Sequence, residues 1–249
     1  MRGVPRRGEW QEDRWCEIPW WGTASALAAP VVLLAGTAAA TRVQPPGFDA
    51  LGNTMSALAG QGANDRWIMT ATFVVVAACD IVTALALRPA PRAGRAVLAA
   101  AGLGGMMVAA FPERLGGSLI HACWAGVAFG ALILWPVLAR RRGPGVPWGL
   151  RPGTVFAVAA ALAALTAWFA AEELFRGADM GLAERAAGVA QTAWPLFVVL
   201  SCRRARPGGL PGAVPADGAP GGSVLSRLIG LITATSGHAG PQPADRADQ

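Results

Sequence analysis

Lysine and tyrosine are both absent from this chain of 249 residues, histidine occurs twice, and charged residues make up only 14% of the sequence. Soluble domains carry roughly 25% charged residues, so the deficit argues against a soluble protein. The hydrophobic share, in contrast, reaches 53%, and the charges cluster between long apolar runs, which is typical of membrane proteins. Because Ala, Gly, Pro and Arg are abundant, we attribute the missing lysine to GC-rich coding rather than to function.

Signatures of catalysis, metal binding and nucleic-acid binding are also missing. The sequence has no GxSxG, HExxH or Walker-type motif, and the cysteines form no CxxC pair. We interpret Cys16, Cys79, Cys123 and Cys202 as small apolar residues and predict no catalytic residue, cofactor or metal. The net charge of +6 does not indicate a nucleic-acid partner, because the arginines lie at the ends of apolar segments, where they orient helices.

Six apolar runs predict six transmembrane helices in one bundle, and therefore an all-α membrane protein over residues 20–204. A helix needs about 20 apolar residues to cross ~30 Å of hydrocarbon, and each run reaches or approaches that length. The predicted spans are residues 20–41, 67–87, 96–111, 118–139, 153–171 and 186–202.

Polar segments flank this bundle. Residues 1–19 form a polar arm, and residues 205–249 are rich in Pro and Gly, which predicts a disordered tail. Within the tail, residues 223–236 place apolar side chains on one helical face and would suit the membrane surface; the alternative is a weakly helical tail without a role. Arg is concentrated in the arm, the second and fourth loops and the early tail, so the positive-inside rule predicts a cell-membrane protein with both termini in the cytoplasm.

Tryptophan and glycine positions refine this picture. Residues 102–105 (GLGG) predict close packing of the third span, and Gly126 and Gly130 form a GxxxG pair suited to close helix contact. Residues 49–59 of the first loop predict a short helix on the membrane surface. Tryptophans at segment ends predict an interfacial belt; they include Trp20, Trp21, Trp67, Trp135 and Trp148.

Asp80 is the one acidic residue well inside a predicted span. A charge there costs on the order of 3 kcal/mol on insertion scales, and intramembrane ionisable groups are functional candidates by default. The alternative is that Asp80 is neutral, or hydrogen-bonded to a hydroxyl or to an arginine near the inner surface such as Arg203.

His121 lies about one turn below the outer start of the fourth span, at a depth similar to that of Gln191 in the sixth. Several carboxylates, among them Glu113 and Glu184, belong to the outer loops. A histidine near carboxylates can relay protons, bind a metal or hold a head group. The alternative is that His121 makes an interhelical hydrogen bond and the carboxylates are merely solvated.

Three outer-side blocks carry a resemblance: LGNTMSALAGQGANDRW (51–67), FPERLGGSLIHACWAGVAF (111–129) and GLAERAAGVAQTAWP (181–195). Over about residues 20–204 the chain resembles the uncharacterised membrane family DUF998 (domain of unknown function 998). The resemblance implies a six-helix protein and supplies no established activity. Asp80 is not part of it. The residues it marks are Asn53, Ser56, Pro112, His121, Gly181, Glu184 and Arg185.

The leading functional hypothesis is an outward-facing polar pocket, formed where the three blocks meet, that binds a lipid head group or a small solute. Membrane lipids are the expected partners. One alternative is an intramembrane lipid hydrolase using His121 with a carboxylate. Another is an accessory subunit of a membrane complex that uses segment 223–236 as its contact. The predicted ligand-binding residues are His121, Glu113, Glu184, Arg185, Asn53, Ser56 and Gln191.

Overall fold

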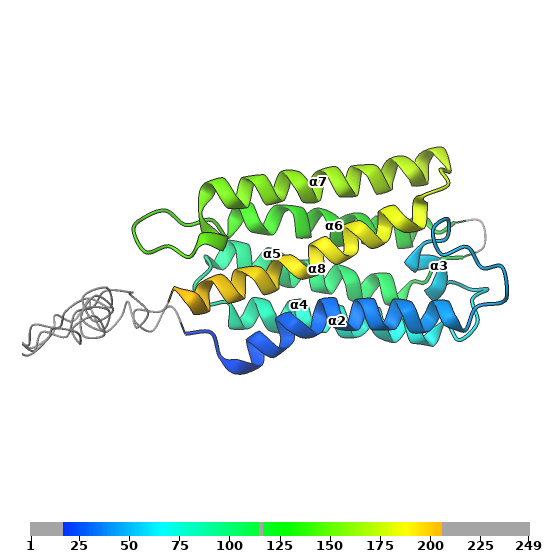
Figure 1. Ribbon diagram of the computed structural model, residues 1–249, viewed down its shortest axis with the longest axis horizontal. Coiled ribbons are helices and arrows are strands. Elements are labelled where there is room, and N and C mark those ends of the chain that lie inside the picture. Colours follow the sequence, from blue (N-terminus) through cyan, green and yellow to red (C-terminus); the bar gives the residue numbers. More distant parts are fainter. Residues whose placement is uncertain (1–16, 115–116, 206–249) are drawn as a thin grey trace, which may run out of the picture. The chain divides into compact units, whose positions relative to one another are not determined.

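The structure, a computed structural model, describes residues 17–114 and 117–205, and its regular secondary structure there is entirely helical, as predicted (Figure 1). The predicted tail segment 223–236 and most of the predicted N-terminal arm lie outside the described residues. The described α-helices are α2 (Trp20–Arg42), α3 (Met55–Ala59), α4 (Trp67–Ala86), α5 (Arg92–Ala110), α6 (Leu119–Leu138), α7 (Pro152–Phe175) and α8 (Met180–Arg204); the 3-10 helix η2 (Trp148–Leu150) precedes α7.

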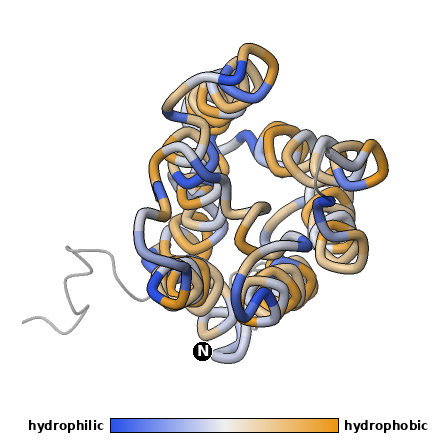
Figure 2. The backbone as a smooth tube through the Cα atoms, turned by 90° about the vertical axis from the view of Figure 1, so that its right-hand side faces the viewer, coloured by the Kyte–Doolittle hydropathy of each residue, from blue (hydrophilic) through white to orange (hydrophobic). Residues whose placement is uncertain are grey.

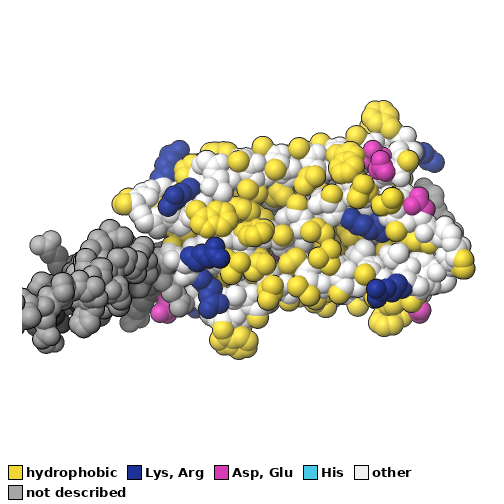
Figure 3. Space-filling model, in the orientation of Figure 1, with side chains coloured by type: hydrophobic (Ala, Val, Ile, Leu, Met, Phe, Trp, Pro, Cys, Tyr) yellow, Lys and Arg dark blue, Asp and Glu magenta, His cyan; other side chains and the backbone are white. Residues whose placement is uncertain are grey.

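Five of the described helices, α2, α4, α5, α6 and α7, are long and apolar enough to cross a membrane. Most residues of each are not buried inside the protein, and large apolar side chains point outward. Apolar side chains on the outside of a bundle suit lipid rather than water. Figure 3 shows them as a broad band along the helices, with charged side chains gathered toward the two ends. The chain is therefore a multi-pass membrane protein.

The predicted count of six spans is not what the structure shows. The sixth predicted span, 186–202, lies within α8, which has 25 residues but is not among the five helices that are apolar enough. Charged residues near both ends of α8, and Gln191 and Thr192 between them, lower its hydropathy. Glu184, Gln191 and Thr192 are buried, so α8 turns its polar side chains into the bundle.

Six long helices pack in a closed ring that follows their order in the sequence, α2–α4–α5–α6–α7–α8, with α8 returning to α2. Figure 2 shows this arrangement along the bundle. Glycine allows α5 to approach its neighbours: a Cβ on Gly102 would lie 2.6 Å from Ala77 O of α4, and one on Gly104 would lie 3.1 Å from Ala128 N of α6. The close packing predicted for residues 102–105 is thus confirmed.

Gly126 and Gly130, in contrast, make no close helix contact within the described chain. Both residues are exposed on α6, and no atom lies within 4 Å of a Cβ built at either position. The predicted use of this pair in packing is therefore wrong for the described chain. The GxxxG spacing places two glycines on one helical face, but the spacing alone does not determine whether that face meets a neighbouring helix.

The core consists of two clusters. The first includes Leu33, Leu58 and Met69 near α3, and the second includes Leu98, Trp135 and Val198 near η2. Trp135 is fully buried in the second cluster, so its predicted place in the interfacial belt is wrong. Trp20 and Trp67 are 78% and 66% exposed at the beginnings of α2 and α4, as the belt requires.

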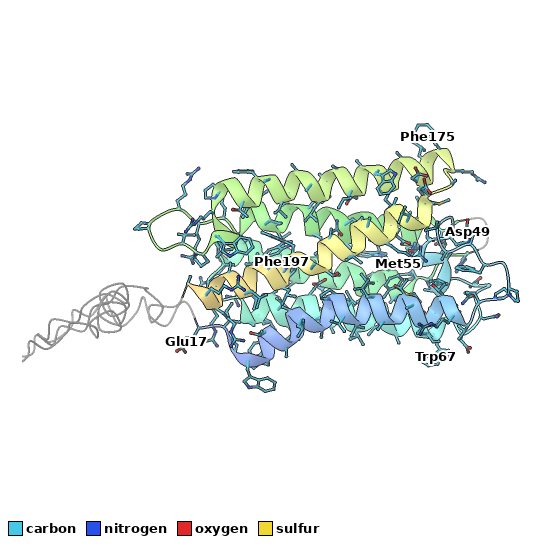
Figure 4. The ribbon with its side chains drawn as sticks, viewed as in Figure 1. Glu17, Asp49, Met55, Trp67, Phe175 and Phe197 are labelled. Atoms are coloured by element: carbon cyan, nitrogen blue, oxygen red, sulfur yellow. The ribbon has the colours of Figure 1, made fainter. Side chains whose placement is uncertain are left out.

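The first loop folds into the bundle instead of lying on the membrane surface. Its helix is shorter than predicted, because α3 begins only after Thr54, whose side chain accepts a hydrogen bond from Ala57 N at 2.9 Å. Met55, Leu58 and Ala59 are all buried. Figure 4 shows Met55 directed inward at the end of the bundle that also carries Asp49, Trp67 and Phe175. We call this end the α3 end, and the opposite end the η2 end.

Candidate functional site

The first loop is attached to α8 through Glu184, which is only 3% exposed. Its carboxylate accepts hydrogen bonds from Met55 N, from Ser56 N at 3.3 Å and from Ser56 Oγ at 2.8 Å. These two amides begin α3, and the first N–H groups of a helix have no partner inside it. Thr54 satisfies the next amide, that of Ala57. A carboxylate at a helix N-terminus is also favoured by the helix dipole, so Glu184 completes the cap of α3 from a distant part of the chain.

Arg185 adds a second attachment beside the first. Its Nη1 donates to Asn53 O at 2.8 Å and to Gly181 O at 2.7 Å, while Leu182 N donates to Leu51 O at 2.9 Å. A Cβ on Gly181 would lie 2.1 Å from Asn53 O, so a side chain at this position would force the two segments apart. The contacts of residues 51–56 with residues 181–185 are named the α3–α8 joint below.

The ionisation of Glu184 follows from its environment. Burial raises the pKa of this carboxyl from 4.5 to about 7; the hydrogen bonds from Ser56 and Met55 and the charge of Arg185 oppose the rise. Burial therefore favours the protonated form of this carboxyl more than water does.

His121 serves the second block rather than the joint. Its Nδ1 lies 2.8 Å from Phe111 O, at the end of α5, and its side chain is 7% exposed. Because a carbonyl only accepts, Nδ1 carries the hydrogen of this bond. Among the described residues no hydrogen bond or ion pair joins His121 to Glu184. His121 thus makes a hydrogen bond from α6 to the end of α5, which is the interhelical hydrogen bond given as its alternative role in the sequence analysis.

Glu113 lies beside this histidine. Burial raises the pKa of Glu113; the nearby His121 lowers it and Glu173 raises it. Its Oε2 atom is buried and has no hydrogen-bond partner within residues 17–114 and 117–205, while its backbone carbonyl accepts from Gln61 N at 3.1 Å. The second block is thus also attached to the first loop.

A pocket of about 360 Å³ opens between these loops at the α3 end, and we call it the loop pocket. Two predicted site residues, Asn53 and Glu113, line it together with Arg114. Side-chain amides and backbone of the first loop complete the wall, which includes Gln44, Gln61, Gly60 and Gly62.

A second space, the central cavity, lies inside the ring of helices and measures about 100 Å³. Three predicted site residues, Ser56, Glu184 and Gln191, line this cavity rather than the loop pocket, and Asp80 lines it from α4. Gln191 Nε2 donates to Thr166 Oγ1 at 3.1 Å. The single pocket predicted at the outer mouth is therefore divided in the structure: its residues are shared among the loop pocket, the joint and the central cavity.

Sequence reasoning missed several residues of these sites. Thr54 carries a recognisable signal, since a threonine before a short apolar run is a typical N-cap. Thr166, which accepts from Gln191, carries none. Phe73 and Phe129, which line the central cavity, carry none either, because apolar positions in a membrane helix look alike in sequence. The sequence offers Arg203 as a hydrogen-bond partner for Asp80, but Nη1 of Arg203 donates to Thr23 Oγ1 at 3.0 Å.

Within residues 17–114 and 117–205, no group of three or more His, Cys, Asp or Glu residues could hold a metal ion.

Comparisons with known proteins agree with the resemblance seen in the sequence. No curated protein and no solved structure matches the chain. Residues 26–201 match a family described as protein of unknown function (DUF998), and this match includes all three blocks and the α3–α8 joint. The chain therefore belongs to the DUF998 family.

Proposed function

We propose that this protein binds a lipid head group or a small polar solute in the loop pocket, on the outer side of the cell membrane. The observation that carries the proposal is the pairing of an acidic and a basic residue, Glu113 and Arg114, in one pocket of about 360 Å³. A ligand that bears both an ammonium and an anionic group would satisfy both. The amides of Asn53 and Gln61 add neutral hydrogen-bonding groups, as in a typical small-molecule site.

The walls of the loop pocket support binding because they are held in place. The first loop is attached to α8 by the α3–α8 joint and to the second block by the bond from Gln61 N to Glu113 O. A site whose groups are already positioned loses less entropy when a ligand binds. The joint thus has a supporting role in this proposal.

Charge supports the outward orientation. The loops at the η2 end carry clusters of arginine, and the loops and helix ends at the α3 end carry most of the described acidic residues. Arginine-rich loops remain in the cytoplasm, so the η2 end and both termini are assigned there. A reporter enzyme that is active only in the cytoplasm, fused to the C-terminus, should be active; activity only of an exported reporter at this terminus would contradict the assignment.

The test compares three variants purified in a non-ionic detergent. Retained phospholipids are measured by mass spectrometry, and glycerophosphoethanolamine, a head group without chains, is titrated directly. Glu113→Gln and Arg114→Gln should each lower retention or binding, whereas Asp65→Asn, an exposed residue at the same end that does not line the pocket, should not. Loss of both lipid retention and head-group binding indicates a lipid, and loss of head-group binding with unchanged lipid retention indicates a soluble solute. Wild-type behaviour of both pocket variants would refute the proposal.

The sequence predicts two alternative functions, a lipid hydrolase and an accessory subunit. An intramembrane lipid hydrolase that uses His121 with a carboxylate stays a prediction: Nδ1 of this ring bonds Phe111 O, and Glu113 lies beside it. A partner contact through segment 223–236 falls outside the described residues and stays a prediction. The loop pocket therefore remains the proposed site.

A further inference from the structure

The central cavity lies between the two core clusters, in the middle of the helix ring. Its lining comes from α2, α3, α4, α5, α6 and α8 and is mostly apolar. Ala77, Gly105, Ala125 and Ala128 leave room where larger side chains would fill the space. A purely apolar cavity would need no explanation beyond imperfect packing. This one, however, contains two carboxyl groups: that of Glu184, which is bonded to α3, and that of Asp80.

Asp80 is 4% exposed and lines the cavity, yet no hydrogen bond or ion pair engages its carboxyl group among the described residues. The polar side chains near Asp80 on its η2 side donate their hydrogen bonds to other groups. Ser25 Oγ donates to Cys79 O, Thr83 Oγ1 donates to Ser25 Oγ, and Arg95 donates to the carbonyls of Ala84 and Leu85. An unpartnered buried carboxyl group is costly, which indicates that a group absent from the chain itself completes this site.

The other polar groups of the cavity mostly offer acceptors. Ser56 Oγ donates to Glu184, and Thr192 Oγ1 donates to Gly188 O at 2.9 Å. Gln191 donates one amide hydrogen to Thr166, which leaves its carbonyl oxygen as an acceptor and its second amide hydrogen unused. The Asp80 carboxylate requires a ligand that brings donors, and its charge disfavours an anion.

The apolar part of the lining distinguishes an organic cation from a metal ion. A metal such as Ca²⁺ or Mg²⁺ requires about six oxygen ligands, and the cavity supplies too few. Phe73 and Phe129 both line it, and aromatic faces attract ammonium groups. The volume of about 100 Å³ holds about three water-sized groups, so the ligand is small.

We propose that the central cavity binds a small organic ammonium ion, with Asp80 as its counter-ion. The ammonium donates to the Asp80 carboxylate and to the Gln191 carbonyl, and its short apolar body contacts the phenylalanine rings and the alanines. This site is separate from the loop pocket, and neither proposal depends on the other.

The experiment uses the full chain in a non-ionic detergent and n-propylammonium chloride as the probe, with n-propanol as the neutral analogue. Saturation-transfer NMR titrations give the affinity. Wild type should bind propylammonium at least tenfold more tightly than propanol, and Asp80→Asn should lose at least tenfold of the ammonium affinity. The matched control Asp65→Asn removes the same charge from an exposed loop residue and should bind as wild type does.

A second variant keeps the test decisive if Asp80→Asn fails to fold. Ala125→Leu leaves the carboxylate in place and fills the cavity that Ala125 lines, so it should also lose ammonium affinity. Asp80→Asn and Ala125→Leu should leave the binding of glycerophosphoethanolamine unchanged, which separates this result from that of the loop pocket. Unchanged affinity in either cavity variant, or an equal loss in Asp65→Asn, would overturn the proposal.

Discussion

Replacing Glu184 by alanine should open the first loop without unfolding the membrane helices. The carboxylate accepts from the buried Met55 amide and from the amide and hydroxyl of Ser56. Hydrogen bonds to charged groups each contribute about 1.5–3 kcal/mol, and a buried donor left without a partner costs about 1–3 kcal/mol. These three bonds, discounted because burial raises the pKa of Glu184, amount to about 3–4 kcal/mol for Glu184→Ala.

Hydrogen exchange measured by mass spectrometry is the appropriate assay, because the loss is local and exchange resolves the opening of individual segments. Peptides covering residues 51–61 should exchange faster in Glu184→Ala by a factor on the order of 10², while peptides of α4 and α7 remain protected. The control Glu173→Ala removes an exposed carboxylate at the same end and should leave residues 51–61 as in wild type. Wild-type protection of residues 51–61 in Glu184→Ala would refute the assigned role of the joint.

Three further changes test the same architecture. The folded-state pKa of Glu184, about 7, lies above its ordinary value of 4.5, so the folded protein binds a proton that the unfolded chain has released, and its stability should fall as pH rises from about 4.5 to 7. Thermal unfolding in detergent should show this decline in wild type and a smaller decline in Glu184→Gln. Equal declines in the two proteins would contradict the assignment. Gly181→Val should place a side chain against Asn53 O, cost more than about 3 kcal/mol and lower the yield of folded protein in size-exclusion chromatography, whereas a normal yield would show that the loop can move away. His121→Phe should leave Phe111 O without its partner and destabilise by about 1–3 kcal/mol in the same thermal assay, with no change in exchange at residues 51–56, since His121 is not part of the joint.

Prediction from sequence worked best where a single helix carries its own signal. A long apolar run is visible locally, so α2, α4, α5, α6 and α7 are recognisable without any knowledge of their neighbours. It failed where a helix is polar on one side: α8 carries Glu184 and Gln191 inside the ring, and its composition no longer identifies a span. Trp135 and the pair Gly126 and Gly130 were misassigned for the same reason, since their roles depend on which face meets another helix.

The candidate site was predicted in its parts but not in its arrangement. Sequence blocks identified Asn53, Ser56, Glu184 and Arg185 as belonging together, and the structure joins them. It joins them as a helix cap and a loop attachment, however, and Glu113 lines a pocket beside that joint. Hydrogen bonds that connect residues about 130 positions apart leave no periodic pattern along the chain.

The sequence by itself determined that this is a helical membrane protein of the DUF998 family, because hydropathy and the family blocks are properties of the chain alone. Only the tertiary structure decided what Glu184 and Asp80 face. Both are buried carboxyl groups that line the central cavity, but Glu184 meets the free amides of α3 and Asp80 meets no partner among the described residues. The physical reason is that the cost of burying a charge depends on which donors the fold places within hydrogen-bond distance.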